Sequence, residues 1–371
     1  MNSRFRRAAA AATLVACAVT GARAQAGAAQ THGLDRANLD TTCAPCADFY
    51  QFANGGWRAR TEIPAAYTTF GTFREVADRS DAVLHSVLED AAKGAKDHST
   101  REAGLFYASC MDTTAIERAG IAPLKSRLAH IDAINSLAAL RAQLAELQML
   151  GENVMFNTGS EPDFKNSAQT ILSLEQGGLG LPERDYYTRT DSASSRLRAT
   201  YLDHIAKLFA LAGEAQAQAS HDAERVMDVE TQLAKASITN TERRDPKGLY
   251  HPMRVAQVDS MAPALDFSEF LKAVHAPPVS VVRVGEPAFV AALNGMLTSV
   301  PLSDWKAYLR WHAVDDDATW TSTRFADAAF RMQQVLRGAK SQLQRWKGCL
   351  QSKKRNLGEA VGQAYVARTF T

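Results

Sequence analysis

The residues that could perform metal or acid–base chemistry are nine histidines, spread along a chain of 371 residues. A helix that binds zinc through H-E-x-x-H carries two histidines four positions apart, so that both imidazoles face one ion. No two histidines of this chain have that spacing, and a G-x-S-x-G nucleophile motif is also absent. Pairs such as His85 with Glu89 are typical of a helix surface. The sequence therefore predicts neither a catalytic residue nor a metal ligand in this chain.

Five cysteines raise the possibility of thiol chemistry or disulfide bonds. Cys43 and Cys46 have the C-x-x-C spacing of redox and zinc-knuckle motifs, but no βαβ pattern surrounds them and no second pair completes four zinc ligands. A small structural disulfide between the two is the favoured interpretation, and a thiol-active protein is the weaker one. Together with Cys110 and Cys349 they allow three pairings, and spacing alone does not choose among them.

The N-terminus has the pattern of a secretory signal peptide over residues 1–24. A basic start is followed by an apolar stretch at 8–21 and by the cleavage site Ala22-Arg23-Ala24. We therefore expect cleavage after Ala24 and a periplasmic or secreted protein. The alternative is a lipoprotein anchored through Cys17, because the residues before it resemble a lipobox. No apolar stretch reaches the roughly 20 residues that span a bilayer, so no transmembrane helix is expected after signal removal.

Composition and charge are those of an ordinary globular protein, with 46% hydrophobic residues, 22% charged residues and a net charge of +2. Loss of residues 1–24, which hold four arginines and no acid, changes the net charge to −2. A nearly neutral chain gives no electrostatic reason to bind nucleic acid, so no nucleic-acid partner is expected. Residues 25–42 are a polar lead, and residues 43–371 are expected to form one domain because nothing marks a boundary within them.

Apolar residues recur at helical spacing through most of the chain, which predicts a mainly α-helical fold. One helix is expected to begin after Ser136 and to end before Gly151, and another ends before Gly213. The best alternating stretch, at 279–284, predicts a short strand. The three aspartates at 315–317 are interpreted as a solvated turn.

Loop signatures in a fixed order carry the most specific information in the sequence. They are C-A-D-F-Y-Q-F-A-N-G-G-W at 46–57 with F-G-T-F at 70–73, Q-G-G-L-G-L-P-E-R-D-Y-Y at 176–187, R-R-D-P-K-G-L-Y-H-P-M at 243–253, R-W-K-G-C at 345–349 and L-G-E-A-V-G-Q-A-Y at 357–365. Together they resemble the N-terminal region of the neprilysin and endothelin-converting enzyme family of zinc metallopeptidases, which includes bacterial endopeptidase O. The resemblance implies a mainly α fold, namely a multi-helical cap domain with a short extended N-terminal lead-in. With a thermolysin-like catalytic domain, such a cap encloses a chamber for peptides.

In that family the zinc ligands and the glutamate base follow the last of these signatures. The chain stops at Thr371, so the resemblance implies the N-terminal domain of a secreted zinc metalloendopeptidase, truncated before the zinc site and inactive alone. No cofactor is expected on this chain, whereas zinc is expected in the complete enzyme. Peptides are expected partners, together with the missing catalytic half. The alternative is a non-catalytic helical protein of the periplasm that binds peptides or a partner.

The resemblance also implies roles for the cysteines. Cys110 and Cys349 match two cysteines that are bridged in the family, which implies a disulfide between them. Cys46 matches a cysteine whose partner lies near the missing C-terminus. In this chain Cys46 is therefore expected either to pair with Cys43 or to stay free.

Substrate contacts follow from the resemblance at one position. Phe73 matches an aromatic residue that helps to wall the S1′ pocket, which suits hydrophobic P1′ side chains. Thr69 stands where neprilysin has an arginine that binds the C-terminal carboxylate of a substrate. A hydroxyl does not replace that bidentate contact, so dipeptidyl-carboxypeptidase activity is not expected. Arg74 is interpreted as a surface residue.

Overall fold

The computed structural model describes residues 34–95, 97–152 and 154–370. The predicted signal peptide at 1–24, with Cys17, and the polar lead up to residue 33 lie outside the described residues. The chain divides into two compact units, one ending at Glu62 and one beginning at Ile63. This division falls inside the span 43–371 that the sequence suggests as one domain.

The first unit is built around helix α1 (Phe49–Arg60), which follows the short 3₁₀ helix η1 (Arg36–Asn38) in the polar lead. The Asp48 side chain caps α1 by accepting a backbone hydrogen bond from its first turn at 2.9 Å. The two glycines of the first loop signature lie in α1. A Cβ on Gly56 would meet the carbonyl oxygen of Ala37 at 2.4 Å, so glycine is what allows α1 to lie directly on the preceding segment.

The second unit is mainly helical, which confirms the predicted fold class. Its elements are α2 (Thr72–Gly94), α3 (His98–Met111), α4 (Thr113–Ala119), η2 (Ala122–Leu124), α5 (Lys125–Asp132), α6 (Leu137–Met149), β1 (Phe156–Pro162), β2 (Thr170–Gln176), α7 (Asp185–Thr188), α8 (Ser192–Leu211), α9 (Gln216–Ala236), η3 (Glu242–Arg244), β3 (His251–Arg254), α10 (Val255–Met261), α11 (Phe267–Ala273), β4 (Val281–Val284), α12 (Pro287–Ser299), α13 (Leu302–Ala318), α14 (Thr323–Arg337) and α15 (Arg345–Thr369). No helix in the described part of the chain has both the length and the apolar character needed to cross a membrane.

Helices α6 and α8 have the end signals that the sequence predicts. The Ser136 hydroxyl accepts a hydrogen bond from the backbone N–H of Ala139 at 3.2 Å, at the start of α6. Gly151 and Gly213 follow the ends of α6 and α8 with φ of +89° and +112°. That left-handed region favours glycine, so both predicted helix ends are confirmed.

The aspartates at 315–317 do not form a solvated turn, because they lie in the last turn of α13. Asp317 Oδ2 is 2.8 Å from Arg127 Nη1, and Asp315 Oδ1 is 3.4 Å from His204 Nε2. The basic partners come from positions more than 100 residues away in the sequence. The local acidic pattern therefore gave no sign of them, and the interpretation as a turn was wrong.

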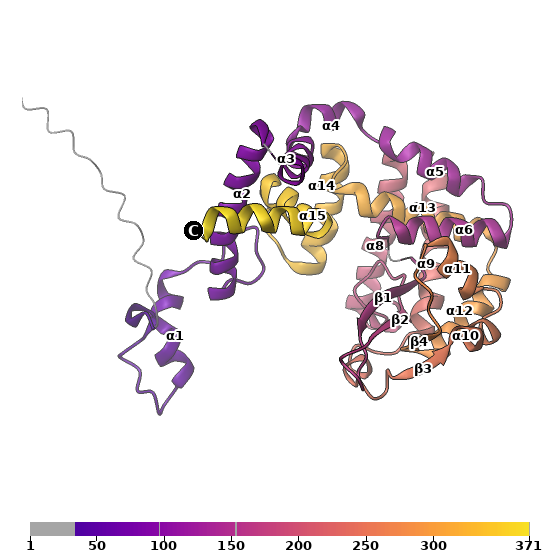
Figure 1. The fold of residues 1–371 in the computed structure, drawn as a ribbon, viewed down its shortest axis with the longest axis horizontal. Coiled ribbons are helices and arrows are strands. Elements are labelled where there is room, and N and C mark those ends of the chain that lie inside the picture. The colour runs from indigo at the N-terminus through magenta and orange to yellow at the C-terminus, as the bar shows by residue number, and fades with distance from the viewer. Residues whose placement is uncertain (1–33, 96, 153, 371) are drawn as a thin grey trace, which may run out of the picture. The chain divides into compact units, whose positions relative to one another are not determined.

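A four-stranded sheet has the order β1-β2-β4-β3. Strands β1 and β2 form an antiparallel hairpin, β4 runs parallel to β2, and β3 pairs antiparallel with β4. Figure 1 shows the strands beside α10, α11 and α12. The predicted strand at 279–284 is confirmed as β4, whose Val282 and Val284 are buried in the centre of the sheet. The hairpin has little sequence signal because β1 contains Gly159 and Pro162, residues that are typical of edge strands.

Two apolar cores hold the second unit together. Helix α13 runs through the larger one, where Trp305, Tyr308 and Trp311 are fully buried and the helix contacts α5, α6, α8, α9 and α14. The smaller core joins α2, α3 and α15, as Figure 1 shows, and includes Leu88 and Tyr107. Helix α2 therefore packs through its middle turns against the last helix of the chain.

Candidate functional site

Phe73 lies in the first turn of α2, and its side chain is 95% exposed. Val76, one turn further on, is also exposed. Thr69 is exposed in the segment that leads into the helix. We define the Phe73 surface as residues Tyr67, Thr69, Phe70, Phe73 and Arg74.

The base of the Phe73 surface is held by a partly buried hydrogen-bonded triad. The Tyr67 hydroxyl donates to Asp78 Oδ1 at 2.7 Å. Lys347 Nζ, from α15, lies 2.7 Å from that hydroxyl and 2.9 Å from Asp78 Oδ1. Burial alone would raise the pKa of Asp78, but the hydrogen bonds from Lys347 and Tyr67 outweigh it and hold the pKa below its usual value. Burial would lower the pKa of Lys347, and its two partners raise it overall.

Ring contacts and backbone hydrogen bonds complete this support. The rings of Tyr67 and Phe70 stack at 6.0 Å between centroids, and the Arg74 guanidinium lies 4.7 Å from the Tyr67 ring centroid. The carbonyl oxygen of Ala65 accepts hydrogen bonds from the backbone N–H groups of residues 340 and 341, at 2.9 and 3.1 Å. The segment before α2 is thereby fixed from both sides, so Phe73 is exposed on a rigid support. Arg74 belongs to this support as well as to the surface.

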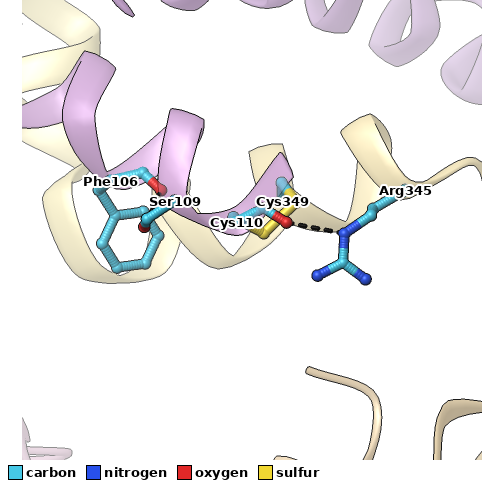
Figure 2. Close-up of a disulfide and its surroundings, with 5 residues drawn as sticks. All are labelled: Phe106, Ser109, Cys110, Arg345 and Cys349. Atoms are coloured by element: carbon cyan, nitrogen blue, oxygen red, sulfur yellow. Dashed lines mark hydrogen bonds between the residues drawn. A yellow bond between two sulfur atoms is a disulfide. The ribbon is translucent and has the colours of Figure 1, made fainter. Parts of the chain in front are cut away.

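The disulfide that the resemblance implies is present between Cys110 of α3 and Cys349 of α15. In Figure 2 the Arg345 Nε donates to the carbonyl oxygen of Cys110, at 2.7 Å. One residue along, Trp346 stacks on His85 of α2 at 4.3 Å between ring centroids. The R-W-K-G-C signature therefore joins α15 to α2 and α3 through four of its five residues, including Lys347 of the triad.

The expected disulfide between Cys43 and Cys46 is not formed, since both cysteines are free thiols in the structure. They lie in the turns before α1, where the Cys43 thiol is directed at the carbonyl oxygens of Ala44 and Asp48, at 3.7 and 3.6 Å. Cys46 is exposed instead. The local hydrogen bonds of the turn, rather than a covalent bond, fix the position of Cys43.

The described residues do not fit a zinc ion. Within 34–95, 97–152 and 154–370, no three His, Cys, Asp or Glu side chains come together as a possible metal site. Several of the described histidines lie beside a single carboxylate instead, for example His312, whose Nε2 lies 3.4 Å from Glu230 Oε1. No step of metal chemistry is therefore assigned to the described residues.

Residues of the signature at 176–187 pack around a buried carboxylate. Glu230 is completely buried and accepts hydrogen bonds from the hydroxyls of Tyr187 at 2.7 Å and Tyr201 at 3.0 Å. Burial and the adjacent carboxylate raise the pKa of both phenols well above its usual value. A Cβ on Gly180 would lie only 1.9 Å from the Tyr201 hydroxyl, so this glycine lets the loop pass over the buried group.

The signature at 243–253 is tied to the sheet. Arg243 Nη2 lies 3.3 Å from Glu175 Oε2 of β2, and the Tyr250 hydroxyl lies 3.1 Å from the carboxylate of Asp163.

The sequence predicted Phe73 as a site residue but did not predict Tyr67, Asp78 and Lys347. The one signal in the sequence for this triad was the R-W-K-G-C signature, which contains Lys347. The partners of Lys347 lie near the other end of the chain, so the signature did not reveal them.

The second unit is mainly helical and carries an exposed aromatic surface at the start of α2. The sequence matches peptidase family M13 over residues 45–371, and the chain belongs to that family.

Named relatives agree with this assignment. The chain is 27% identical over 345 residues to endothelin-converting enzyme 1 of Rattus norvegicus, which covers 90% of this chain and 45% of the relative. It is 30% identical over 362 residues to membrane metallo-endopeptidase-like 1 of Homo sapiens, covering 90% and 46%. The chain thus spans about half the length of the curated relatives it matches.

Solved structures show the same fold. The zinc metalloprotease Zmp1 of Mycobacterium tuberculosis, in complex with an inhibitor, superposes with a TM-score of 0.85 at 30% identity, over 91% of this chain and 52% of that one. PepO of Lactobacillus rhamnosis superposes with a TM-score of 0.78 at 21% identity, over 87% and 51%, and supports the fold alone.

Proposed function

We propose that this chain is the helical N-terminal part of a secreted or periplasmic zinc metalloendopeptidase, and that peptides contact it at the Phe73 surface. The observation that carries the proposal is the exposure of Phe73 on a rigid support. Phe73 and Val76 lie three positions apart on one face of α2 and together form an exposed apolar area, the kind of feature that marks binding surfaces.

In this proposal the chain binds the peptide, and residues outside the chain supply the zinc chemistry. The sequence lacks an H-E-x-x-H motif, and relatives of about twice its length include proteins named as metalloproteases. In the working enzyme the Phe73 ring would cover an apolar side chain of the peptide. Covering one such side chain contributes about 1.5–3 kcal/mol, which favours peptides with hydrophobic residues.

The localisation of the protein is part of the same proposal. Residues 1–24 would direct the chain out of the cytoplasm and be removed after Ala24, with a lipid anchor on Cys17 as the alternative. Mass spectrometry of the mature N-terminus separates the two, because a free residue 25 supports cleavage and a lipidated cysteine supports the anchor.

Peptide binding to the purified chain tests the role of Phe73. We expect a fluorescent peptide rich in hydrophobic residues to bind, and Phe73→Ala to weaken binding by about tenfold, in line with the loss of one buried ring. Phe370→Ala is the matched control, because Phe370 is also exposed, at 72%, but lies outside the Phe73 surface. Equal affinity of the wild type and Phe73→Ala would contradict the proposal.

A further inference from the structure

Positive charges lie around the exposed apolar pair of Phe73 and Val76. Arg74 follows Phe73 directly in the first turn of α2. Arg79 follows Val76 by three positions, so the two are neighbours on the helix surface. Lys340 lies in the segment that leads from α14 into α15. We call Arg74, Arg79 and Lys340 the basic rim.

The charge of Arg74 is not neutralised by the triad beneath it. The guanidinium lies 4.7 Å from the ring centroid of Tyr67, whose hydroxyl is fixed on Asp78. The Asp78 carboxylate is already paired with Lys347 at 2.9 Å, so this one carboxylate faces two cations. Arg74 forms no ion pair of its own with a carboxylate of the described residues. One positive charge therefore remains beside Phe73 on a rigid support.

Arg79 and Lys340 add two further cations to this surface, and both residues are exposed. The Nε of Arg79 donates to the backbone carbonyl oxygen of Glu75 at 3.4 Å, a contact that neutralises no charge. The backbone N–H of Lys340 donates to the carbonyl oxygen of Ala65 at 2.9 Å, which holds Lys340 next to the segment before α2. Neither cation is paired with a carboxylate in the part of the chain that the structure describes.

Carboxylates are fewer than cations at this surface. The first two turns of α2 supply Glu75 and Asp78. Glu75 is half-buried and has an interaction of its own, and Asp78 is paired with Lys347. The basic rim and Lys347 together therefore outnumber the carboxylates, and the unpaired cations lie beside an apolar area. Such a surface is complementary to a ligand that is both apolar and acidic.

We propose that the Phe73 surface binds peptides in which aspartate or glutamate flanks a hydrophobic residue. The hydrophobic side chain would cover Phe73 and Val76, and the carboxylates would meet the basic rim. This inference rests on the proposed peptide-binding role of the surface and names the class of peptide. An arginine can hold a carboxylate through two parallel N–H bonds, and the Arg74 guanidinium is already oriented by the Tyr67 ring.

Two matched peptides test the proposal on the wild-type chain. They are Gly-Glu-Phe-Glu-Gly and Gly-Gln-Phe-Gln-Gly, each with the same N-terminal dye and a C-terminal amide, so that only side chains supply carboxylates. Fluorescence polarisation at about 0.01 M salt is expected to show about fivefold tighter binding of the glutamate peptide. At about 1 M salt, where the Debye length falls to about 3 Å, the two affinities should be nearly equal.

Variants assign the preference to the basic rim. The ratio of the two affinities is taken within each variant, so that a general loss of binding cancels. Arg74→Gln combined with Arg79→Gln is expected to reduce the ratio from about fivefold to below about twofold, and Arg79→Lys, which keeps the charge, should retain it. Arg196→Gln is the matched control, because it removes the same charge at an exposed position of α8 and should leave the ratio unchanged.

The outcomes separate this inference from the proposed function. Equal affinity of the two peptides at low salt overturns the inference, whereas the proposed function requires only that the glutamine peptide bind and that Phe73→Ala weaken it. A preference for glutamate that persists in the double variant overturns the role of the basic rim. Failure of both peptides to bind contradicts the inference and the proposed function together.

Discussion

The ammonium group of Lys347 lies 2.7 Å from the hydroxyl of Tyr67, although 280 positions separate the two residues in the sequence. Both groups meet the same carboxylate oxygen of Asp78. This contact joins the start of α15 to the segment that carries Phe73. The position of the proposed peptide-binding surface therefore depends on the last helix of the chain.

Removal of the Lys347 ammonium should loosen that surface. Lys347→Met keeps most of the stem but leaves Asp78 and Tyr67 without their cation, so we expect a loss of about 1–3 kcal/mol in the free energy of unfolding. Urea denaturation measures it. Lys207→Met, at an exposed position of α8, is the control and should be close to neutral. Unchanged stability of Lys347→Met would show that the triad does not hold the segment.

The disulfide between Cys110 and Cys349 should contribute strongly to stability. It closes a loop across a separation of 239 residues, and a chain-entropy model gives about 5 kcal/mol for a loop of this length. We expect Cys110→Ala and reducing agent to lower the melting temperature to a similar extent. The variant Cys43→Ser with Cys46→Ser should melt like the wild type, because both thiols are free. A large loss in that control would contradict the assignment of the free thiols.

Gly180 should be intolerant of a side chain. Its Cβ would lie 1.9 Å from the Tyr201 hydroxyl, which is fixed by Glu230, so Gly180→Ala is expected to cost about 1–3 kcal/mol. Gly295→Ala is the control, because nothing lies within 4 Å of a Cβ there and the position is inside α12. Alanine should stabilise that helix by up to about 1 kcal/mol. Chemical denaturation should show that Gly180→Ala lowers the free energy of unfolding and that Gly295→Ala raises it.

Glu152 should make stability depend on pH. Burial is the main reason that the pKa of Glu152 is raised to about 7, although Arg127 opposes it. The unfolded value is about 4.3, so the folded state is destabilised as the pH rises from about 4 to about 7. The free energy of unfolding of Glu152→Gln, relative to that of the wild type, should therefore rise by about 1–3 kcal/mol as the pH increases from about 4 to about 7, and should stay at that level above it. A pH-independent difference between the two proteins would refute this, and exposed Glu269→Gln is the control.

Local signals in the sequence predicted local features of the fold. Helix caps such as Ser136 and glycines such as Gly213 act within a few residues, so the ends of α6 and α8 could be located. The strand β4 could be located because three of its four residues are valines, a residue type that favours strands. The β1–β2 hairpin could not, since an edge strand with glycine and proline resembles a loop.

The candidate site could be predicted only in part. Phe73 was assigned by resemblance, whereas the triad beneath it depends on a contact between residues near both ends of the chain. The same reason explains the error at 315–317, where Arg127 and His204 supply partners that no local pattern reveals. The Cys43–Cys46 disulfide was expected from spacing, but spacing does not report the turn that directs the Cys43 thiol to backbone carbonyls.

The central claim is that this chain contributes peptide contacts while zinc chemistry comes from residues outside it. The most direct measurement is a peptidase assay of the purified chain with added zinc, with zinc content determined on the same sample. We predict no cleavage of a hydrophobic peptide and no stoichiometric zinc. Stoichiometric zinc together with cleavage that a chelator abolishes would contradict the claim.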